Sequence, residues 1–439
     1  MRLTLTIALC AALPVTAQDV VPSTLVGHAF LPANTMSTPP ADAPRDAWVS
    51  GKFTAGADLR QMRPMQNMRD TGLALPFIGQ PFQGISGYAF NRAEDDSIIA
   101  LIDNGFGNKQ NSPDALLSFT RLTPDFETGA ATIHERIYLH DPDFTVPFKI
   151  AYEGTDSRYL TGADFDPESI QVVGDTVWIG EEFGPYLISA TLDGRLTGVY
   201  PTMLDGAELR SPDHPALRIP ASRGKDWVVP RSGGYEGLAL TPDQSTLWGM
   251  LEKPIFGTDG ETEGDFLRVL AFDPVTAEWT GESFKFALTE GAVAVGDFNF
   301  IDVTRALVIE RDGGQGDPSL PCQTEGAEGC FEEPAQVKRI TLIDTSQIDA
   351  DGFVARLKQI DLMDIDDPDG LSHLETSMAT PVAGKFTFPF VTIESVIRDG
   401  DEHIIVGNDN NLPFSIGRRL GAADNNEMIR LHVPELLAD

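Results

Sequence analysis

Five short apolar runs in this chain end abruptly in an acidic or amide residue, and this recurrence constrains the fold more than any other feature. The runs are IIALIDNGFG, VWIGEEFGP, LWGMLEKP, ALVIERDGG and IIVGNDNN. A carboxylate that closes a run typical of a buried strand has to be neutralised by a metal, an arginine or hydrogen bonds. If the runs are equivalent strands of a closed radial repeat, their ends meet around one axis and form a ring of oxygen ligands.

The segments around each run favour such a repeat. A second polar position lies 11 to 17 residues upstream of the polar end of each run, as in GISGYAF, DPESI, GYEGL, VGDFNF and TIESV. Further strands follow each run, as in LLSFTRL and IHERIYL, with Asp, Gly and Pro at the turns between them. This order of strands is the plan of a propeller blade.

The predicted fold is therefore all-β, a β-propeller of four-stranded blades. Five blades are readable from the sequence, and a sixth is expected from residues 48–80 together with the C-terminus, which makes six the predicted number. We expect the ring to close through one blade that takes strands from both ends of the chain, because closure protects the sheet edges.

The first residues predict export. Residues 1–17, MRLTLTIALCAALPVTA, have one arginine, a short apolar run and a small-residue end, as a signal peptide does. An extended lead-in is expected over residues 18–50, and a single propeller domain over residues 51–439. The predicted location is periplasmic or secreted. In that oxidising compartment the two cysteines outside the signal peptide, Cys322 and Cys330, are expected to form a disulfide.

The net charge and the absence of two catalytic sequence motifs reduce the number of possible functions. Acidic residues outnumber Lys and Arg 66 to 32, and the net charge of −34 repels nucleic acid and anionic membrane surfaces. We expect a monomer that binds a small-molecule ester, with no nucleic-acid partner and no membrane insertion. The sequence has neither a G-x-S-x-G elbow nor an H-E-x-x-H motif, which disfavours a serine hydrolase and a zinc peptidase.

The propeller geometry brings the polar positions of all the blades together as a predicted metal site. Crowded carboxylates cannot all stay ionised without cations, and a set of oxygen donors without His or Cys selects Ca²⁺ first and Mg²⁺ second. The alternative is that each acid pairs with an Arg, a Lys or backbone N–H groups of its own blade. The candidate ligands are Asp103, Asn104, Glu168, Glu182, Glu236, Glu252, Glu310, Glu394, Asn408 and Asp409.

Basic residues adjoin several of these positions. Lys253 follows Glu252 directly, Arg311 follows Glu310 directly, and Arg418 lies shortly after the last run. Positive groups beside a metal site are typical of a clamp for substrate oxyanions, although pairing with the neighbouring acid is the alternative. Tyr186 is expected either to reach the same funnel as a donor or to pack at its rim.

At these blocks the sequence resembles the bacterial family described as having esterase-like activity of phytase. The matching segments are DPESIQVVGDTVWIGEEFGPY, GGYEGLALTPDQSTLWGMLEK, FNFIDVTRALVIERDGG and VTIESVIRDGDEHIIVGNDNNLPFS, which with the first block cover most of residues 80–420. The resemblance implies a propeller hydrolase of phosphoric or carboxylic esters. Ser86 departs from the pattern, since the other blades offer Glu or Asp there. The ligands implied most strongly are Glu182, Glu236, Glu252, Glu310, Glu394 and Asn408.

The function expected from the sequence is a metal-dependent hydrolase of phosphoesters at the mouth of the propeller channel. The metal would polarise the phosphoryl oxygen, and a glutamate not bound to the metal would act as general base. The alternatives are a carboxylic esterase or lactonase at the same site, and a non-catalytic propeller that binds a ligand or partner around structural calcium. The expected catalytic carboxylates are Glu182, Glu236, Glu252 and Glu310.

Overall fold

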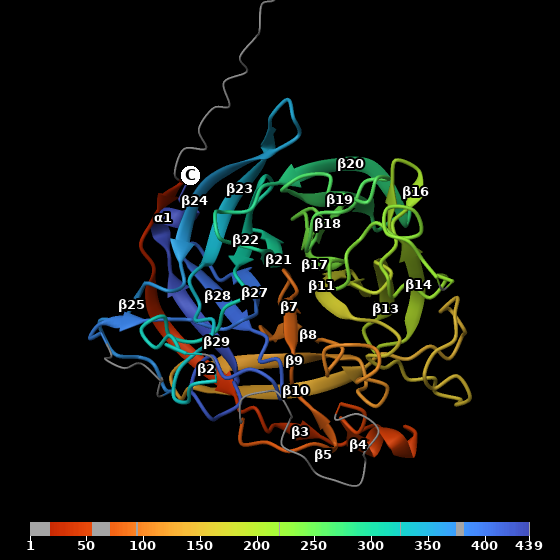
Figure 1. Ribbon diagram of the computed structural model, residues 1–439, viewed down its shortest axis with the longest axis horizontal. Helices are drawn as coiled ribbons and strands as arrows, with labels where there is room; N and C mark the ends of the chain where they lie inside the picture. Colours follow the sequence, from red (N-terminus) through yellow and green to blue (C-terminus); the bar gives the residue numbers. More distant parts are fainter. Residues whose placement is uncertain are drawn as a thin grey trace, which may run out of the picture.

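The computed structural model describes residues 18–54, 71–93, 95–218, 220–324, 326–374 and 382–438. The predicted signal peptide, residues 1–17, lies outside the described residues. The regular secondary structure of the described part consists almost entirely of β-strands, which are arranged around a centre (Figure 1). None of the helices in these ranges has the length and apolar character that a membrane span requires.

Five antiparallel units of four strands form the blades of a β-propeller, which confirms the predicted fold class; blades 1 and 5 are joined into one sheet where β2 pairs with β10. Blade 1 contains β7 (Ile85–Tyr88), β8 (Ile98–Ile102), β9 (Ser118–Asp125) and β10 (Ala130–Tyr138). Blade 2 contains β11 (Pro167–Val173), β12 (Thr176–Glu181), β13 (Tyr186–Thr191) and β14 (Leu196–Pro201). Blade 3 contains β17 (Tyr235–Leu240), β18 (Leu247–Leu251), β19 (Leu267–Asp273) and β20 (Glu278–Phe286).

The remaining two blades use both ends of the chain. Blade 4 contains β21 (Ala294–Phe300), β22 (Arg305–Arg311), β23 (Lys338–Ile348) and β24 (Val354–Asp361). Blade 5 contains β27 (Ile393–Arg398), β28 (His403–Asn408), β29 (Asn426–His432) and, from the N-terminal segment, β2 (Thr24–Leu31). Strand β2 runs antiparallel to β29, so the predicted closure of the ring by both chain ends is confirmed. The short strand β1 (Asp19–Val20) also adds to β24 in parallel.

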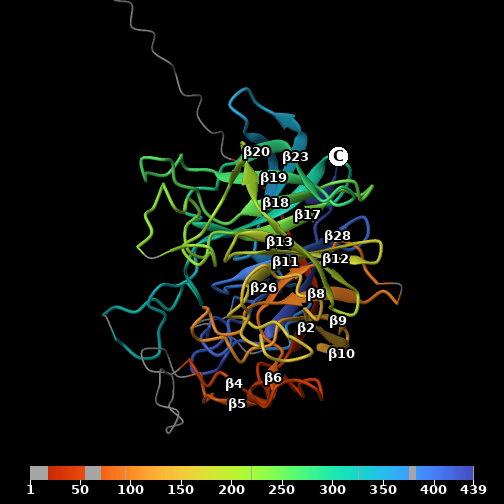
Figure 2. The same ribbon diagram turned by 90° about the vertical axis from the view of Figure 1, so that its right-hand side faces the viewer.

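The ring has five blades in the described residues, and the expectation of a sixth is corrected. The first strands contact one another in the closed order β7, β11, β17, β21, β27 and back to β7. The C-terminal strands cannot build a further blade, because they already form blade 5 with β2. Part of the segment 48–80 forms only short pairs: β4 (Val49–Ser50) with β5 (Phe77–Ile78), and β3 (Met36–Ser37) with β6 (Gln80–Pro81). These pairs lie beside β10 of blade 1 (Figures 1 and 2).

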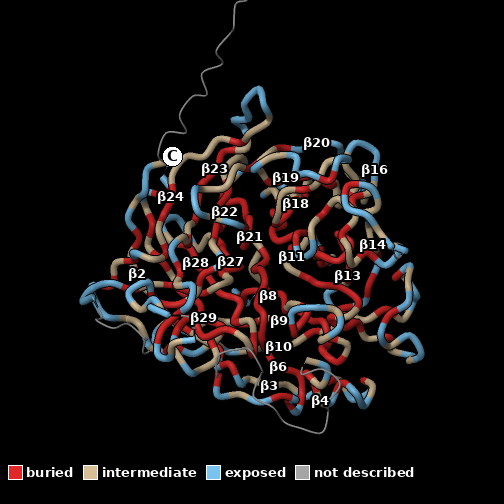
Figure 3. Tube along the Cα trace, in the orientation of Figure 1, coloured by how far each residue is buried: buried red, intermediate tan, exposed pale blue. Residues whose placement is uncertain are grey.

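The second strand of each blade is buried on both faces, which explains why the five runs are continuously apolar rather than alternating. All five residues of β8 are buried, and so is every residue of β12 after Thr176. Buried backbone fills the centre of the molecule around the first strands (Figure 3). The predicted disulfide, Cys322–Cys330, is present in the loop between β22 and β23 and is confirmed.

One polar network joins the first strands of all five blades. The side chain of Asn299 on β21 lies at its centre and is 1% exposed. Its hydrogen-bond partners are Tyr88 O at 3.3 Å, Val396 O at 3.0 Å, Asp297 Oδ2 at 3.1 Å and Gln171 Nε2 at 2.8 Å. Gln171 also donates to the carbonyl oxygen of Leu238 at 2.6 Å, which brings in blade 3. Two amides therefore connect the backbone of the whole ring, since each blade contributes at least one partner.

Replacing Asn299 with Ala is expected to lower the free energy of unfolding by about 3 kcal/mol, because buried carbonyl groups on several blades lose their donor. Urea denaturation measures this change. Asn34→Ala, at an exposed asparagine, is the control and is expected to cost less than about 0.5 kcal/mol. Equal effects of the two substitutions would show that the central network does not hold the blades together.

Candidate metal centre

A β-bulge lies at one end of each blade, and in four of the five blades it carries a polar side chain. In all five blades the pairing between the first and second strands shifts by one residue, which leaves an extra residue on the first strand. Bulges of this kind change the direction in which a side chain points. On the first strand, one residue comes directly after the last pair before the shift. In blades 1 to 5 this residue is Ser86, Glu168, Glu236, Gly296 and Glu394, respectively.

The same register identifies the equivalent residues at the ends of the second strands. In blade 2, for example, Pro167 on the first strand is the last residue paired before the bulge, and its partner on the second strand is Glu181. The residue directly after that partner, Glu182, is the position of interest. We call these five positions the tips: they are Asp103, Glu182, Glu252, Arg311 and Asp409. Four of the five tips are acidic, and the fifth is an arginine.

Carboxylates from blades 2 and 3 converge into two groups that share one residue. Oxygens of Asp166, Glu168 and Glu182 lie within 4.8 Å of one another, and so do oxygens of Glu182, Glu236 and Glu252. Asp166 and Glu182 are each 4% exposed, yet Oδ1 of Asp166 and Oε1 of Glu182 have no hydrogen-bond partner. Buried carboxylate oxygens without a donor leave an unmet need for positive charge.

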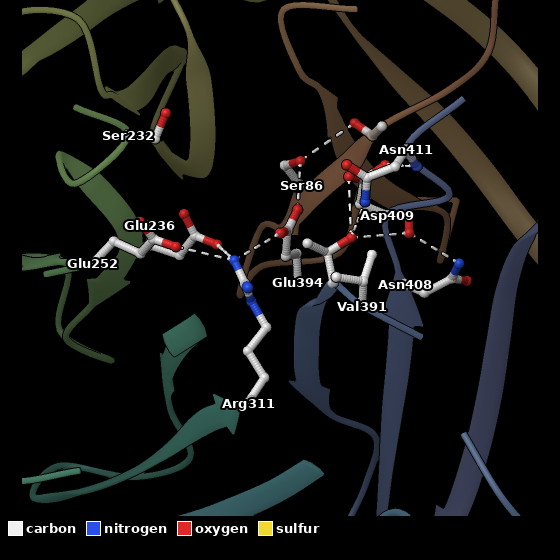
Figure 4. Close-up of polar contacts among 12 residues, drawn as sticks. Ser86, Ser232, Glu236, Glu252, Arg311, Val391, Glu394, Asn408, Asp409 and Asn411 are labelled. Atoms are coloured by element: carbon white, nitrogen blue, oxygen red, sulfur yellow. Dashed lines mark hydrogen bonds and ion pairs between the residues drawn. The ribbon is translucent and has the colours of Figure 1, made fainter. Parts of the chain in front are cut away.

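Arg311 supplies positive charge on the other side of the ring. Its Nη2 atom lies 3.0 Å from Oε1 of Glu252, 3.3 Å from Oε1 of Glu236 and 3.6 Å from Oε1 of Glu394 (Figure 4). Ser86 donates a hydrogen bond of 2.9 Å to the other oxygen of Glu394. One guanidinium thus joins carboxylates from blades 3 and 5 to blade 4.

Burial raises the pKa of the central acids, and mutual repulsion adds to it. The pKa values of Glu168, Glu182 and Glu394 lie well above the usual range, first because of desolvation and then because of neighbouring carboxylates. Burial and then Glu252 raise the pKa of Glu236 to about 8, while Arg311 opposes the shift. Burial raises the pKa of Asp166 to about 6. Without a cation, the site therefore holds several protons near neutral pH.

The donor set fits a hard metal ion. Asp166, Glu168 and Glu182 offer carboxylate oxygens only, and two of these oxygens lack any hydrogen-bond partner. Oxygen donors are the ligands of Ca²⁺ and Mg²⁺, whereas zinc sites typically contain His or Cys. These buried acidic groups can hold a metal ion.

The first and last blades place their expected ligands at the edge of this centre. Burial, and then the charges of Asp409 and Asp166, raise the pKa of Asp103 well above its usual value. Both oxygens of Asp409 are engaged: Oδ1 accepts from the backbone N–H of Asn411 at 2.6 Å, and Oδ2 accepts from the hydroxyl of Thr392 at 3.2 Å. The amide of Asn104 bonds to Asp166, while its Oδ1 accepts from backbone groups in its own turn. Asn104 therefore orients Asp166 rather than offering a free oxygen.

Two expected ligands do not face the centre, and those expectations are corrected. Glu310 precedes the tip of blade 4, and because side chains alternate along a strand it points away from Arg311. Its carboxylate is bound by Arg356 at 2.7 and 3.1 Å and by the hydroxyl of Thr341, so neither a metal role nor a catalytic role is left for it. Asn408 likewise precedes the tip of blade 5, and its amide bonds to the backbone of Glu427 at 2.6 Å and of neighbouring residues.

Two expected substrate-binding residues are also engaged elsewhere. The guanidinium of Arg418 binds both carboxylate oxygens of Glu427, at 3.0 and 2.7 Å, and is 5% exposed. The hydroxyl of Tyr186 bonds to Nε2 of His214 at 2.8 Å, and its ring packs in the core of blade 2. Lys253, in contrast, lies at the rim, where Nζ is 2.7 Å from Oε2 of Glu252 and the side chain is 35% exposed.

Asp166 is the ligand that sequence reasoning missed. In blade 2 the backbone N–H of the tip Glu182 donates to the carbonyl oxygen of Asp166 at 3.0 Å. The corresponding carbonyls in blades 1 and 3 belong to Gly84 and Gly234. The signal was the acid two residues before Glu168, at a position where these other blades have glycine.

A family model described as Phytase-like, esterase-like activity of phytase, matches residues 80–412. The chain belongs to this family. The match confirms the resemblance predicted from the glutamate-containing segments, and it covers all five second strands of the phytase-like propeller. No curated protein sequence matches the chain.

Solved structures of low similarity include an arabinanase from Bacillus subtilis, with 11% identity over 79% of this chain and 96% of that one and a TM-score of 0.33. A PQQ-bound aldose sugar dehydrogenase from Streptomyces coelicolor has 12% identity over 84% and 96%, with a TM-score of 0.34. A gluconolactonase from Xanthomonas campestris has 11% identity over 94% and 96%, with a TM-score of 0.31. Similarity at this level carries no argument about activity.

Glu182→Gln is expected to weaken calcium binding by about 100-fold, because it removes the carboxylate common to both groups. Isothermal titration of the calcium-free protein measures the affinity. Glu310→Gln is the matched control, because it replaces another buried glutamate, directly before the tip of blade 4. It is expected to lower stability but to leave calcium affinity unchanged. Equal losses of calcium affinity in the two variants would contradict the assignment of Glu182.

The raised pKa values predict how stability depends on pH in the metal-free protein. An unfolded glutamate titrates near about pH 4.3, while Glu236 titrates at about 8 in the folded chain, so the folded state holds more protons between these values. The free energy of unfolding therefore falls as pH rises from 5 to 8, by about 1.4 kcal/mol per pH unit for each extra proton. Glu427, whose pKa Arg418 lowers to about 2 against the effect of burial, does not titrate in this window.

Urea denaturation at pH 5 and pH 8, with EDTA and with calcium, tests this dependence. Calcium is expected to restore stability at pH 8 and to change it little at pH 5, where protons already neutralise the acids. A metal-free protein that is more stable at pH 8 than at pH 5 would contradict the raised pKa values.

Proposed function

We propose that this phytase-like propeller is an exported, calcium-dependent hydrolase of phosphoric esters that acts as a monomer on a small-molecule substrate. The observation that carries the proposal is the group Asp166–Glu168–Glu182, with unpaired buried oxygens, beside the partly exposed side chain of Lys253. Negative ligands for a cation next to a positive group at the rim suit a substrate that is itself anionic. The disulfide supports export, since such bonds persist in oxidising compartments.

Asp166, Glu168 and Glu182 would hold the ion. When bound there, calcium would polarise a phosphoryl oxygen and lower the pKa of a water molecule. The phytase-like family membership supports ester hydrolysis as the reaction class.

The chain's own residues have distinct roles in this proposal. Lys253, whose side chain is 35% exposed, binds a phosphate oxygen at the rim. Glu252, held between Lys253 and Arg311, accepts the proton of the attacking water. The water oxygen bonds to phosphorus and the ester P–O bond breaks. The departing alkoxide takes up a proton from solvent to leave as the alcohol, and Glu252 releases the proton that it accepted to solvent. Arg311 fixes Glu252 and Glu236 through its guanidinium, which keeps the base in position.

Hydrolysis assays with p-nitrophenyl phosphate, bis-p-nitrophenyl phosphate and p-nitrophenyl acetate test the proposal. Turnover of a phosphate ester is expected, with loss in EDTA and recovery on addition of calcium. Lys253→Gln is expected to raise KM more than it lowers kcat, because it removes substrate binding at the rim.

Turnover of the acetate ester alone would assign the site to a carboxylic esterase or lactonase instead. No turnover of any of the three esters with calcium supplied would favour a non-catalytic propeller. Phosphate-ester turnover that EDTA leaves unchanged would contradict the role of the metal.

A further inference from the structure

Arg311 departs from the pattern of the ring. The four other tips, Asp103, Glu182, Glu252 and Asp409, are all acidic, and the register between the strands makes Arg311 their equivalent in blade 4. Blade 4 thus places a cation where every other blade places an anion.

The position of the guanidinium matches that of a bound cation. Arg311 is 9% exposed, and its Nη2 atom lies within 3.6 Å of carboxylate oxygens of Glu236, Glu252 and Glu394. Blade 4 adds no other side chain at its bulge, because a Cβ atom at Gly296 would lie 1.8 Å from the carbonyl oxygen of Ile393. The contribution of this blade to the centre is the arginine.

The carboxylates therefore divide into a neutralised half and an open half. In the neutralised half, Glu252 forms ion pairs through both oxygens, Oε1 with Arg311 and Oε2 with Lys253, although Oε2 has no hydrogen bond. In the open half, Asp166 and Glu182 each keep a buried oxygen without a hydrogen-bond partner. The group Glu182–Glu236–Glu252 has the spacing for an ion, but the guanidinium already contacts two of its three members.

We infer that Arg311 takes the place of a second metal ion and limits the chain to one ion, held by Asp166, Glu168 and Glu182. Two-metal hydrolases place a pair of ions side by side to stabilise charge on both sides of the reacting phosphorus. In this chain the second positive charge is built into blade 4. The inference rests on the metal site of the proposed function and adds the number of ions and the residue that sets it.

Calcium titration of the full chain, after treatment with EDTA, tests the inference. Isothermal titration together with elemental analysis is expected to give one ion per wild-type chain and two ions for Arg311→Met, because methionine keeps an unbranched side chain but removes the charge. Arg311→Lys keeps a cation and is the matched control, with one ion expected. Adding Glu252→Gln to Arg311→Met is expected to return the count to one.

Each outcome decides between the claims. One ion in both the wild type and Arg311→Met overturns the inference and leaves the proposed function intact, and so does a count of two in the wild type. No ion in either protein overturns the proposed function as well. Arg311→Met leaves three buried acids without their partner, so it is to be refolded with calcium present. Should it not fold, the wild-type count still tests the inference, because two ions beside Arg311 would overturn it.

Discussion

The site depends on one backbone feature, the register shift between the first two strands of every blade. Because each shift lies at the same end of its blade, residues as far apart in sequence as Ser86 and Glu394 come to face one channel and hydrogen-bond to each other. The amides of Asn299 and Gln171 tie the same five strands together. The fold thus determines the positions of the acids, whether or not a negative charge is favourable at those positions.

Their charge is unfavourable there, and the structure offsets it in two different ways. Arg311 and Lys253 neutralise the acids of blades 3 and 5, whereas Asp166 and Glu182 of blade 2 keep unpaired oxygens. Protons or a cation have to supply the remaining charge, because buried carboxylates cannot stay ionised alone. A site that is partly neutralised by its own residues, and partly open, is suited to bind a metal and an anionic substrate side by side.

The sequence predicted the repeat and most of the ring, since a strand buried on both faces has to be continuously apolar and its polar end is then conspicuous. It could not show the bulge register. The predicted ligand of blade 4, Glu310, was therefore one residue before the tip Arg311, and in blade 5 Asn408 was predicted together with the tip Asp409. Asp166 was missed as a metal ligand, because that role depends on its position beside Glu182, the tip of blade 2. The sixth blade was wrong because β2 completes the C-terminal blade, a long-range pairing with no local signal.

Anomalous diffraction from crystals soaked in terbium chloride, with terbium as a hard-ion probe for calcium, tests the central claim most directly. The account predicts a strong peak among the carboxylates of Asp166, Glu168 and Glu182, and no second peak beside Arg311. Peaks confined to the outer faces of the blades, with the channel mouth empty, would contradict it.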